Sequence, residues 1–231
     1  MGKLRISEIF ASVQGEGIWV GVPSVFVRTS GCNLRCTWCD TPYASWNPEG
    51  PVMELKDIVA EVERHQIDHV VLTGGEPMLF DPIEELAANL KELGHTITIE
   101  TAGTIHRYIQ CDLMSISPKL ANSTPPQDSG WEERHESTRL DREPLKQLLQ
   151  NYNCQLKFVV NPDVPGDIEE IEGLLAELPS IEPGRVLLMA EGINAEILHR
   201  RMQALVPICM ARNWRLTPRL HVDLFGNTRG T

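Results

Sequence analysis

Short apolar runs rich in branched residues alternate along the chain with longer stretches in which apolar residues recur at helical spacing. The short runs predict β-strands, and the longer stretches predict helices. The expected strands are residues 24–28, 69–73, 96–100, 113–117, 155–160 and 185–189. The expected helices are residues 53–65, 82–93, 144–152, 168–178 and 194–212. Strands that alternate with crossover helices indicate a parallel α/β sheet.

Three segments depart from this alternation. Pro207 lies in the last helical stretch, and we expect it to kink that helix or end it early, because proline lacks an amide hydrogen. Residues 121–143 are polar and charged, which predicts a surface loop insertion. The pattern of residues 219–224 predicts a last strand.

The charge balance narrows the possible partners. The chain has 21 Lys and Arg against 32 Asp and Glu, a net charge of −11. Binding to nucleic acid or to a membrane surface needs clustered basic charge, so we expect neither partner. No apolar run approaches ~18 residues, and the start of the chain lacks the apolar core of a secretory signal. We therefore expect a soluble, cytoplasmic protein.

Three cysteines carry the strongest chemical signal. Cys32, Cys36 and Cys39 are spaced C-x3-C-x2-C directly after a predicted strand. Three thiolates from one short loop can hold three irons of a 4Fe-4S cluster, while the fourth iron stays open to a reacting ligand. On spacing alone, a zinc site completed by Asp40 or a distant histidine remains open, as does coincidence.

Several candidate residues directly follow predicted strands, among them Cys32, Gly74, Thr101, Ser117 and residues 190–192, which include Glu191. Such loops converge on one face of an α/β barrel and build its site. Six or seven strands are too few for a closed barrel of eight, so we expect an incomplete barrel that is open on one side. Lys157 lies within a predicted strand and points either into this barrel or outward.

The cysteine loop, with Trp38 directly before its last cysteine, resembles that of radical S-adenosylmethionine (SAM) enzymes. Gly74-Gly75-Glu76-Pro77 is similar to the GGEP segment of that superfamily, which contacts the amino group of SAM. Further segments narrow the resemblance to the family of 7-carboxy-7-deazaguanine synthases: residues 14–17, 21–28, 39–41, 100–103 and 117–119. One departure is Ala102, where relatives often carry a polar residue.

The resemblance implies a fold, a reaction and partners. The fold is an incomplete TIM-like barrel of the radical SAM type, a single core domain over residues 1–231. The cofactors are a 4Fe-4S cluster, SAM and Mg²⁺. The reaction is the radical-mediated ring contraction of 6-carboxy-5,6,7,8-tetrahydropterin to 7-carboxy-7-deazaguanine with release of ammonia, in queuosine and 7-deazapurine biosynthesis. The implied partners are a second copy of the chain, as a homodimer, and a flavodoxin-like or other low-potential electron donor.

The resemblance also implies roles for individual residues. The cluster ligands are Cys32, Cys36 and Cys39, and the Thr41 hydroxyl ligates Mg²⁺, a hard ion that prefers oxygen. The substrate-binding residues are Val13, Gln14, Gly15, Glu16, Arg28 and Thr101. The SAM-binding residues are Gly74, Gly75, Glu76, Gly103, Ser117, Pro118 and Lys119. Arg28 suits the substrate carboxylate because its guanidinium offers paired planar donors.

Two other functions remain as alternatives. A glycyl-radical enzyme activase shares the cysteine loop and a glycine-rich second motif, but acts on a partner protein. A zinc-stabilised binding module without catalysis would use the same cysteines for one structural ion.

Overall fold

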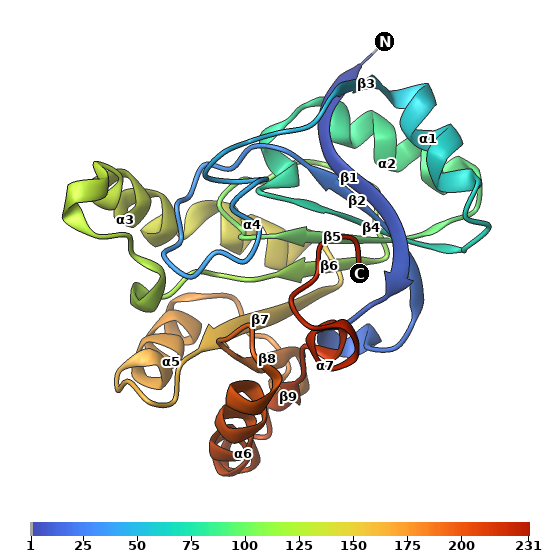
Figure 1. Cartoon of the computed structure of the whole chain (residues 1–231). Helices are drawn as coiled ribbons and strands as arrows, with labels where there is room; N and C mark the ends of the chain where they lie inside the picture. The colour runs from blue at the N-terminus through green and yellow to red at the C-terminus, as the bar shows by residue number, and fades with distance from the viewer. Residues whose placement is uncertain (1) are drawn as a thin grey trace.

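A computed structural model describes residues 2–231 of the chain. One nine-stranded sheet runs through them in the order β3-β1-β2-β4-β5-β6-β7-β8-β9. β1 pairs antiparallel with β2 and β3, and the other neighbouring pairs are parallel. The strands are β1 (Lys3–Val13), β2 (Pro23–Thr29), β3 (Val52–Glu54), β4 (His69–Gly74), β5 (Thr96–Thr101), β6 (Leu113–Ile116), β7 (Cys154–Val160), β8 (Val186–Ala190) and β9 (Arg215–Thr217). β3 and β9 lie at opposite ends of the sheet, which confirms the incomplete barrel (Figure 1).

Helices connect most of the parallel strands. They are α1 (Leu55–Glu63), α2 (Pro82–Glu92), α3 (Glu132–Leu140), α4 (Glu143–Asn151), α5 (Asp167–Glu177), α6 (Ala195–Arg212) and α7 (Leu220–Phe225). Their apolar residues recur at helical spacing, as in α2, where Ile83, Leu86 and Leu90 are all buried. None of the helices within residues 2–231 combines the length and apolar character that crossing a bilayer requires.

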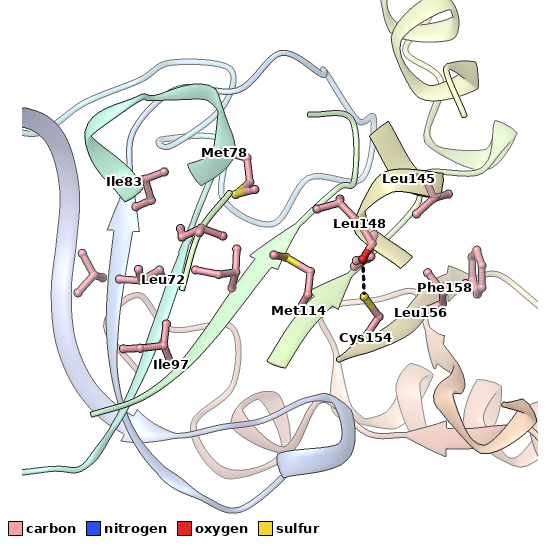
Figure 2. Packing of buried hydrophobic residues seen from close by; sticks show 14 of the residues in the cluster. Leu72, Met78, Ile83, Ile97, Met114, Leu145, Leu148, Cys154, Leu156 and Phe158 are labelled. Atoms are coloured by element: carbon pink, nitrogen blue, oxygen red, sulfur yellow. Dashed lines mark hydrogen bonds between the residues drawn. The ribbon is translucent and has the colours of Figure 1, made fainter. Parts of the chain in front are cut away.

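The core lies between the sheet and these helices. Successive side chains of a strand point to opposite faces, so every second residue joins the core. Leu72, Ile97 and Met114, from three neighbouring strands, belong to this buried cluster together with Leu145 and Leu148 of α4 (Figure 2). The intervening residues face the other side of the sheet, where the strand ends surround a cavity.

The predicted strands and helices are confirmed, with ends that differ by at most two residues, except for the predicted last strand. β1, β3 and β9 were not predicted. β3 and β9 have only three residues each, which leaves too little pattern to recognise.

Three expectations need correction. The predicted loop 121–143 contains α3, which projects at the left in Figure 1. α6 continues through Pro207 to Arg212, so the helix does not end early. Pro207 and Gln203, whose carbonyl loses its amide partner, are both exposed, so water can replace that bond. The predicted last strand is the helix α7.

Candidate active site

A cavity of about 220 Å³ opens at the carboxyl ends of the parallel strands. Strand ends, the cysteine loop and the C-terminal segment all contribute to its wall. The predicted site residues that line it are Val13, Gln14, Gly15, Glu16, Arg28, Cys32, Cys36, Cys39, Thr41, Gly74, Gly75, Thr101, Ser117 and Lys119. Glu76, Gly103 and Pro118 do not line it.

The cysteine loop follows β2 directly. Cys32, Cys36 and Cys39 are free thiols that line the same cavity. Burial raises the pKa of Cys32 to about 12 and that of Cys36 to about 11. These thiols are therefore protonated at neutral pH without a metal, and metal binding would release their protons.

The donor set fits an iron-sulfur cluster. Within residues 2–231, no three His, Cys, Asp or Glu side chains converge on a point where one metal ion would sit. A cluster attaches each thiolate to a different iron, so it needs three thiols around one cavity rather than convergence on one ion. The Ser45 hydroxyl lies 3.0 Å from Cys39 Sγ, and the Leu34 amide donates to Cys32 Sγ at 3.4 Å. Hydrogen bonds of this kind tune the potential of a cluster.

The segment before α3 holds the cysteine loop in place. The Thr37 amide donates to the Ser123 carbonyl at 2.9 Å, and Trp38 Nε1 donates to Asn122 Oδ1 at 3.1 Å. Thr37 and Trp38 are thus both held by hydrogen bonds to neighbouring residues of that segment. Part of the predicted insertion therefore supports the loop that carries the cysteines.

α3 contacts the same loop through a side chain. The Arg35 amide donates to His135 Nδ1 at 3.1 Å, and the Arg35 guanidinium lies 4.0 Å from the ring centroid of Trp131. His135 is the only buried residue of α3. α3 is thus anchored on the cysteine loop rather than on the apolar core.

Paired glycines bring β4 against the cysteine loop. Gly74 has a φ of +155°, a conformation that favours glycine. A Cβ on Gly75 would meet the backbone carbonyl oxygens of Gly31 and Ala44, the latter at 2.6 Å. Only glycine allows this approach, which leaves backbone groups open to the cavity.

Glu76 is fully buried behind the cavity wall. Its carboxylate accepts from Thr101 Oγ1 at 2.8 Å, from the Ala102 amide at 2.8 Å and from the Met78 amide at 3.0 Å. Burial raises the pKa of Glu76, and these hydrogen bonds oppose the rise. Glu76 therefore orients Thr101 and Ala102, which both line the cavity.

Lys157 points into the barrel, which decides between the two orientations left open by the sequence. It forms an ion pair with Glu16, which also accepts from Arg219 Nε at 3.2 Å. Burial raises the pKa of Glu16, but Lys157 and Arg219 outweigh it, and the pKa lies well below its ordinary value. Arg219 further contacts Asp40 and donates to the Gly192 carbonyl at 2.6 Å. One arginine thus joins the end of β1, the cysteine loop and the loop after β8.

Arg28 lines the cavity from β2. Its Nε donates to Glu8 at 2.6 Å, and Tyr43 donates to the same carboxylate at 3.0 Å. A guanidinium has five N–H donors, so the pairing with Glu8 leaves others for a ligand. Glu8 also orients the guanidinium plane.

Several cavity residues were not predicted as site residues: Asp40, Glu100, Ser115, Arg219, His221 and Thr231. The last three come from the C-terminal segment. Arg219 and His221 follow β9, as other site residues follow earlier strands, but β9 was not predicted, so no sequence signal pointed to them. A second hollow of about 490 Å³ shares Trp38, Cys39, Asp40 and Arg219 with the cavity and extends to residues 191–193.

Known proteins are similar to this chain in sequence and in fold. The sequence profile of the radical SAM superfamily matches residues 26–153. The chain is 47% identical over 240 residues to 7-carboxy-7-deazaguanine synthase of Halobacterium salinarum, an alignment that covers 99% of this chain and 93% of that protein. It is 44% identical to the enzyme of the same name from Rhodopirellula baltica, over 99% of this chain and 89% of that protein.

Solved structures are also similar to this chain. The crystal structure of QueE from Escherichia coli matches with a TM-score of 0.70 and 26% identity, covering 95% of each chain. A structure of TYW1 with a lysine-pyruvate adduct matches with a TM-score of 0.56 and 14% identity, over 82% of this chain and 72% of that one, and shares the fold alone. The chain belongs to the 7-carboxy-7-deazaguanine synthase family of the radical SAM superfamily.

Proposed function

We propose that this chain converts 6-carboxy-5,6,7,8-tetrahydropterin to 7-carboxy-7-deazaguanine and ammonia, for queuosine and other 7-deazapurines. The observation that carries the proposal is a single cavity in which three free thiols, paired glycines and Arg28 meet. Membership of the radical SAM superfamily implies a 4Fe-4S cluster and SAM as cofactors.

The chain's own residues would hold these cofactors. Cys32, Cys36 and Cys39 would hold the cluster. When bound, the cluster and SAM would supply the radical chemistry that removes a hydrogen atom from the pterin. The cavity wall would hold the pterin ring in a fixed orientation towards the bound cofactors.

The SAM-binding proposal rests on the wall around the cysteines. Gly74 and Gly75 offer backbone groups to the amino group, while Glu76 and Gly103 support that wall from behind. Lys119 donates to Ser117 at 2.9 Å and lies 5.7 Å from the ring centroid of Trp38, where its charge suits a carboxylate. Pro118 lies between those two residues and restricts the backbone there.

The substrate would lie on the other side of the cavity. Arg28 would bind its carboxylate, with Val13, Gln14, Gly15, Glu16 and Thr101 around the ring. Mg²⁺ would bind between the Thr41 hydroxyl and oxygens of the substrate, since a hard cation prefers oxygen ligands. Thr41 lines the cavity beside Cys39, with its hydroxyl 3.8 Å from that sulfur.

The family resemblance also suggests where the enzyme acts, its oligomeric state and its electron donor. The enzyme would act in the cytoplasm as a homodimer, over a single core domain, and would take electrons from a flavodoxin-like or other low-potential donor. The acidic net charge of −11 agrees with the absence of nucleic-acid and membrane partners from this proposal.

An anaerobic product assay tests the function. Reconstituted protein is incubated with dithionite, SAM, Mg²⁺ and the pterin, and the products are read by mass spectrometry. We expect 7-carboxy-7-deazaguanine and 5'-deoxyadenosine, both lost in Cys36→Ala and both retained in the matched control Cys111→Ala. Formation of deoxyadenosine while the pterin stays unchanged would show that this pterin is not the substrate. Hydrogen transfer from a glycine of a partner protein would instead indicate an activase.

A further inference from the structure

Among the described residues, Glu100 is the acidic side chain of the cavity wall that forms no salt bridge. The other acidic side chains of the wall are paired, as Glu16 is with Lys157 and Arg219. None of the salt bridges found within residues 2–231 includes Glu100. Its carboxylate faces the cavity between two neutral hydrogen-bond donors, and Lys157, a cation of the wall, is paired with Glu16 and acts on Glu100 only at longer range.

Those neutral groups fix the carboxylate from both sides. Gln14 Nε2 donates to Oε1 at 3.1 Å, and Thr73 Oγ1 donates to Oε2 at 3.1 Å. An ionised carboxylate has about four acceptor positions, so roughly two remain for a ligand. Glu100 is half-buried and lines the cavity. A charge held in this way would gain from N–H donors that a ligand brings.

Strand register places Glu100 in line with Arg28. Arg28 of β2 pairs with Thr73 of β4, and Leu72 pairs with Ile99, which puts Thr73 beside Glu100 of β5. β2, β4 and β5 are consecutive strands of the sheet (Figure 1). Neighbouring strands lie about 4.8 Å apart, so Arg28 and Glu100 are about 10 Å apart along this row. A two-ring heterocycle with a carboxylate at one end spans a distance of that order.

The proposed substrate accepts hydrogen bonds at one end and donates them at the other. Its carboxylate suits Arg28, while its amino-pyrimidinone ring presents N–H donors at the far end. We propose that Glu100 determines specificity by accepting hydrogen bonds from that donor edge, with Gln14 and Thr73 holding the carboxylate in place. This assignment rests on the proposed function and adds to it the group that recognises the pterin.

A charge-removing variant tests the assignment. Glu100→Gln keeps the shape of the side chain and replaces one acceptor oxygen with a donor. A hydrogen bond to a charged group accounts for a change of roughly tenfold to a hundredfold, so we expect KM for the pterin to rise by that factor. KM for SAM and the iron content should stay at the wild-type values. The matched control is Glu92→Gln, an exposed carboxylate on α2.

An analogue tests it without any substitution. The corresponding tetrahydrolumazine carries an oxygen in place of the 2-amino group and would place an acceptor against Glu100. Wild-type enzyme should bind it at least about tenfold more weakly than the pterin, and Glu100→Gln should narrow that ratio. Equal binding of the two compounds by the wild-type enzyme would overturn the assignment. This test holds even where the variant loses its cluster.

The outcomes separate this assignment from the function it rests on. Wild-type enzyme that turns over the pterin while Glu100→Gln has the same KM would refute only the role of Glu100. A rise in KM for SAM instead would also refute it and would assign the carboxylate to the cofactor. Wild-type enzyme with a full cluster that leaves the pterin unchanged would refute both.

Discussion

His135 joins α3 to the cysteine loop, and its removal should loosen that loop. The side chain is fully buried, and Nδ1 accepts from the Arg35 amide at 3.1 Å. Nε2 lies 3.0 Å from Ser123 Oγ, whose own hydrogen is donated to the Leu120 carbonyl at 2.6 Å. Ser123 must therefore accept from Nε2–H, which makes His135 a neutral ring with its hydrogen on Nε2.

The magnitude follows from these contacts. His135→Ala leaves the Arg35 amide without its acceptor, which costs about 1–3 kcal/mol, and it removes packing around a fully buried ring. A total of about 2–4 kcal/mol lowers Tm by about 4–16 °C for a domain of this length. His135→Asn keeps an acceptor near the position of Nδ1, so its loss should be smaller, about 1 kcal/mol.

The same contacts predict a pH dependence. Burial lowers the pKa of His135 to about 4, with Arg139 and Lys119 lowering it further and Glu136 opposing them. The unfolded chain, with an ordinary histidine pKa, binds the proton first. Stability should therefore be complete above about pH 6.5 and fall by roughly 3 kcal/mol as the pH drops towards 4. His135→Asn should show a flatter profile over that range.

The assay combines thermal melting from about pH 7 to pH 5 with iron and sulfide content after anaerobic reconstitution. We expect His135→Ala to melt earlier and to retain less cluster, because Arg35 lies between Cys32 and Cys36, which we propose as cluster ligands. The control His199→Ala, at an exposed position on α6, should behave like the wild type. A His135→Ala protein that melts like the wild type and keeps a full cluster would refute this reasoning.

Three further predictions concern the cavity wall. Gly75→Ala should abolish cluster retention, measured by iron content, because its Cβ would press on the backbone carbonyls of Gly31 and Ala44; an unchanged iron content would contradict the close approach. Glu76→Gln turns an amide donor towards the amide of Ala102 or Met78, so Tm should fall by about 4–10 °C and kcat should drop; a wild-type melt would count against its positioning role. Thr41→Val should weaken the stimulation of turnover by Mg²⁺ while iron content is retained; an identical Mg²⁺ titration would remove Thr41 from the metal site.

Local patterns were sufficient for most of the sheet and helices. The parallel strands are short apolar runs, and α2 has buried residues at helical spacing, so neighbours in sequence carry the signal. α3 could not be recognised in this way, because its one buried residue is the polar His135. It is held by hydrogen bonds to a loop that lies about a hundred residues earlier.

Some residues of the site could likewise be predicted from local sequence, while others depend on the fold. About half of the residues that line the cavity were predicted site residues, and several of them follow strands, whose ends converge at one edge of a parallel sheet. Arg219 could not be assigned a role from local sequence, because its contact with Glu16 spans 203 residues and depends on the fold of the C-terminal segment. The inward direction of Lys157 likewise depends on which face of β7 meets the core.

The proposed function requires this cavity to bring a pterin carbon within reach of the radical formed from SAM. The most direct test is anaerobic turnover with 6-carboxytetrahydropterin deuterated at its saturated ring carbons, followed by mass spectrometry of 5'-deoxyadenosine. We expect deuterium in the deoxyadenosine together with formation of 7-carboxy-7-deazaguanine. Deoxyadenosine without deuterium, from protein with a full cluster and bound pterin, would contradict it.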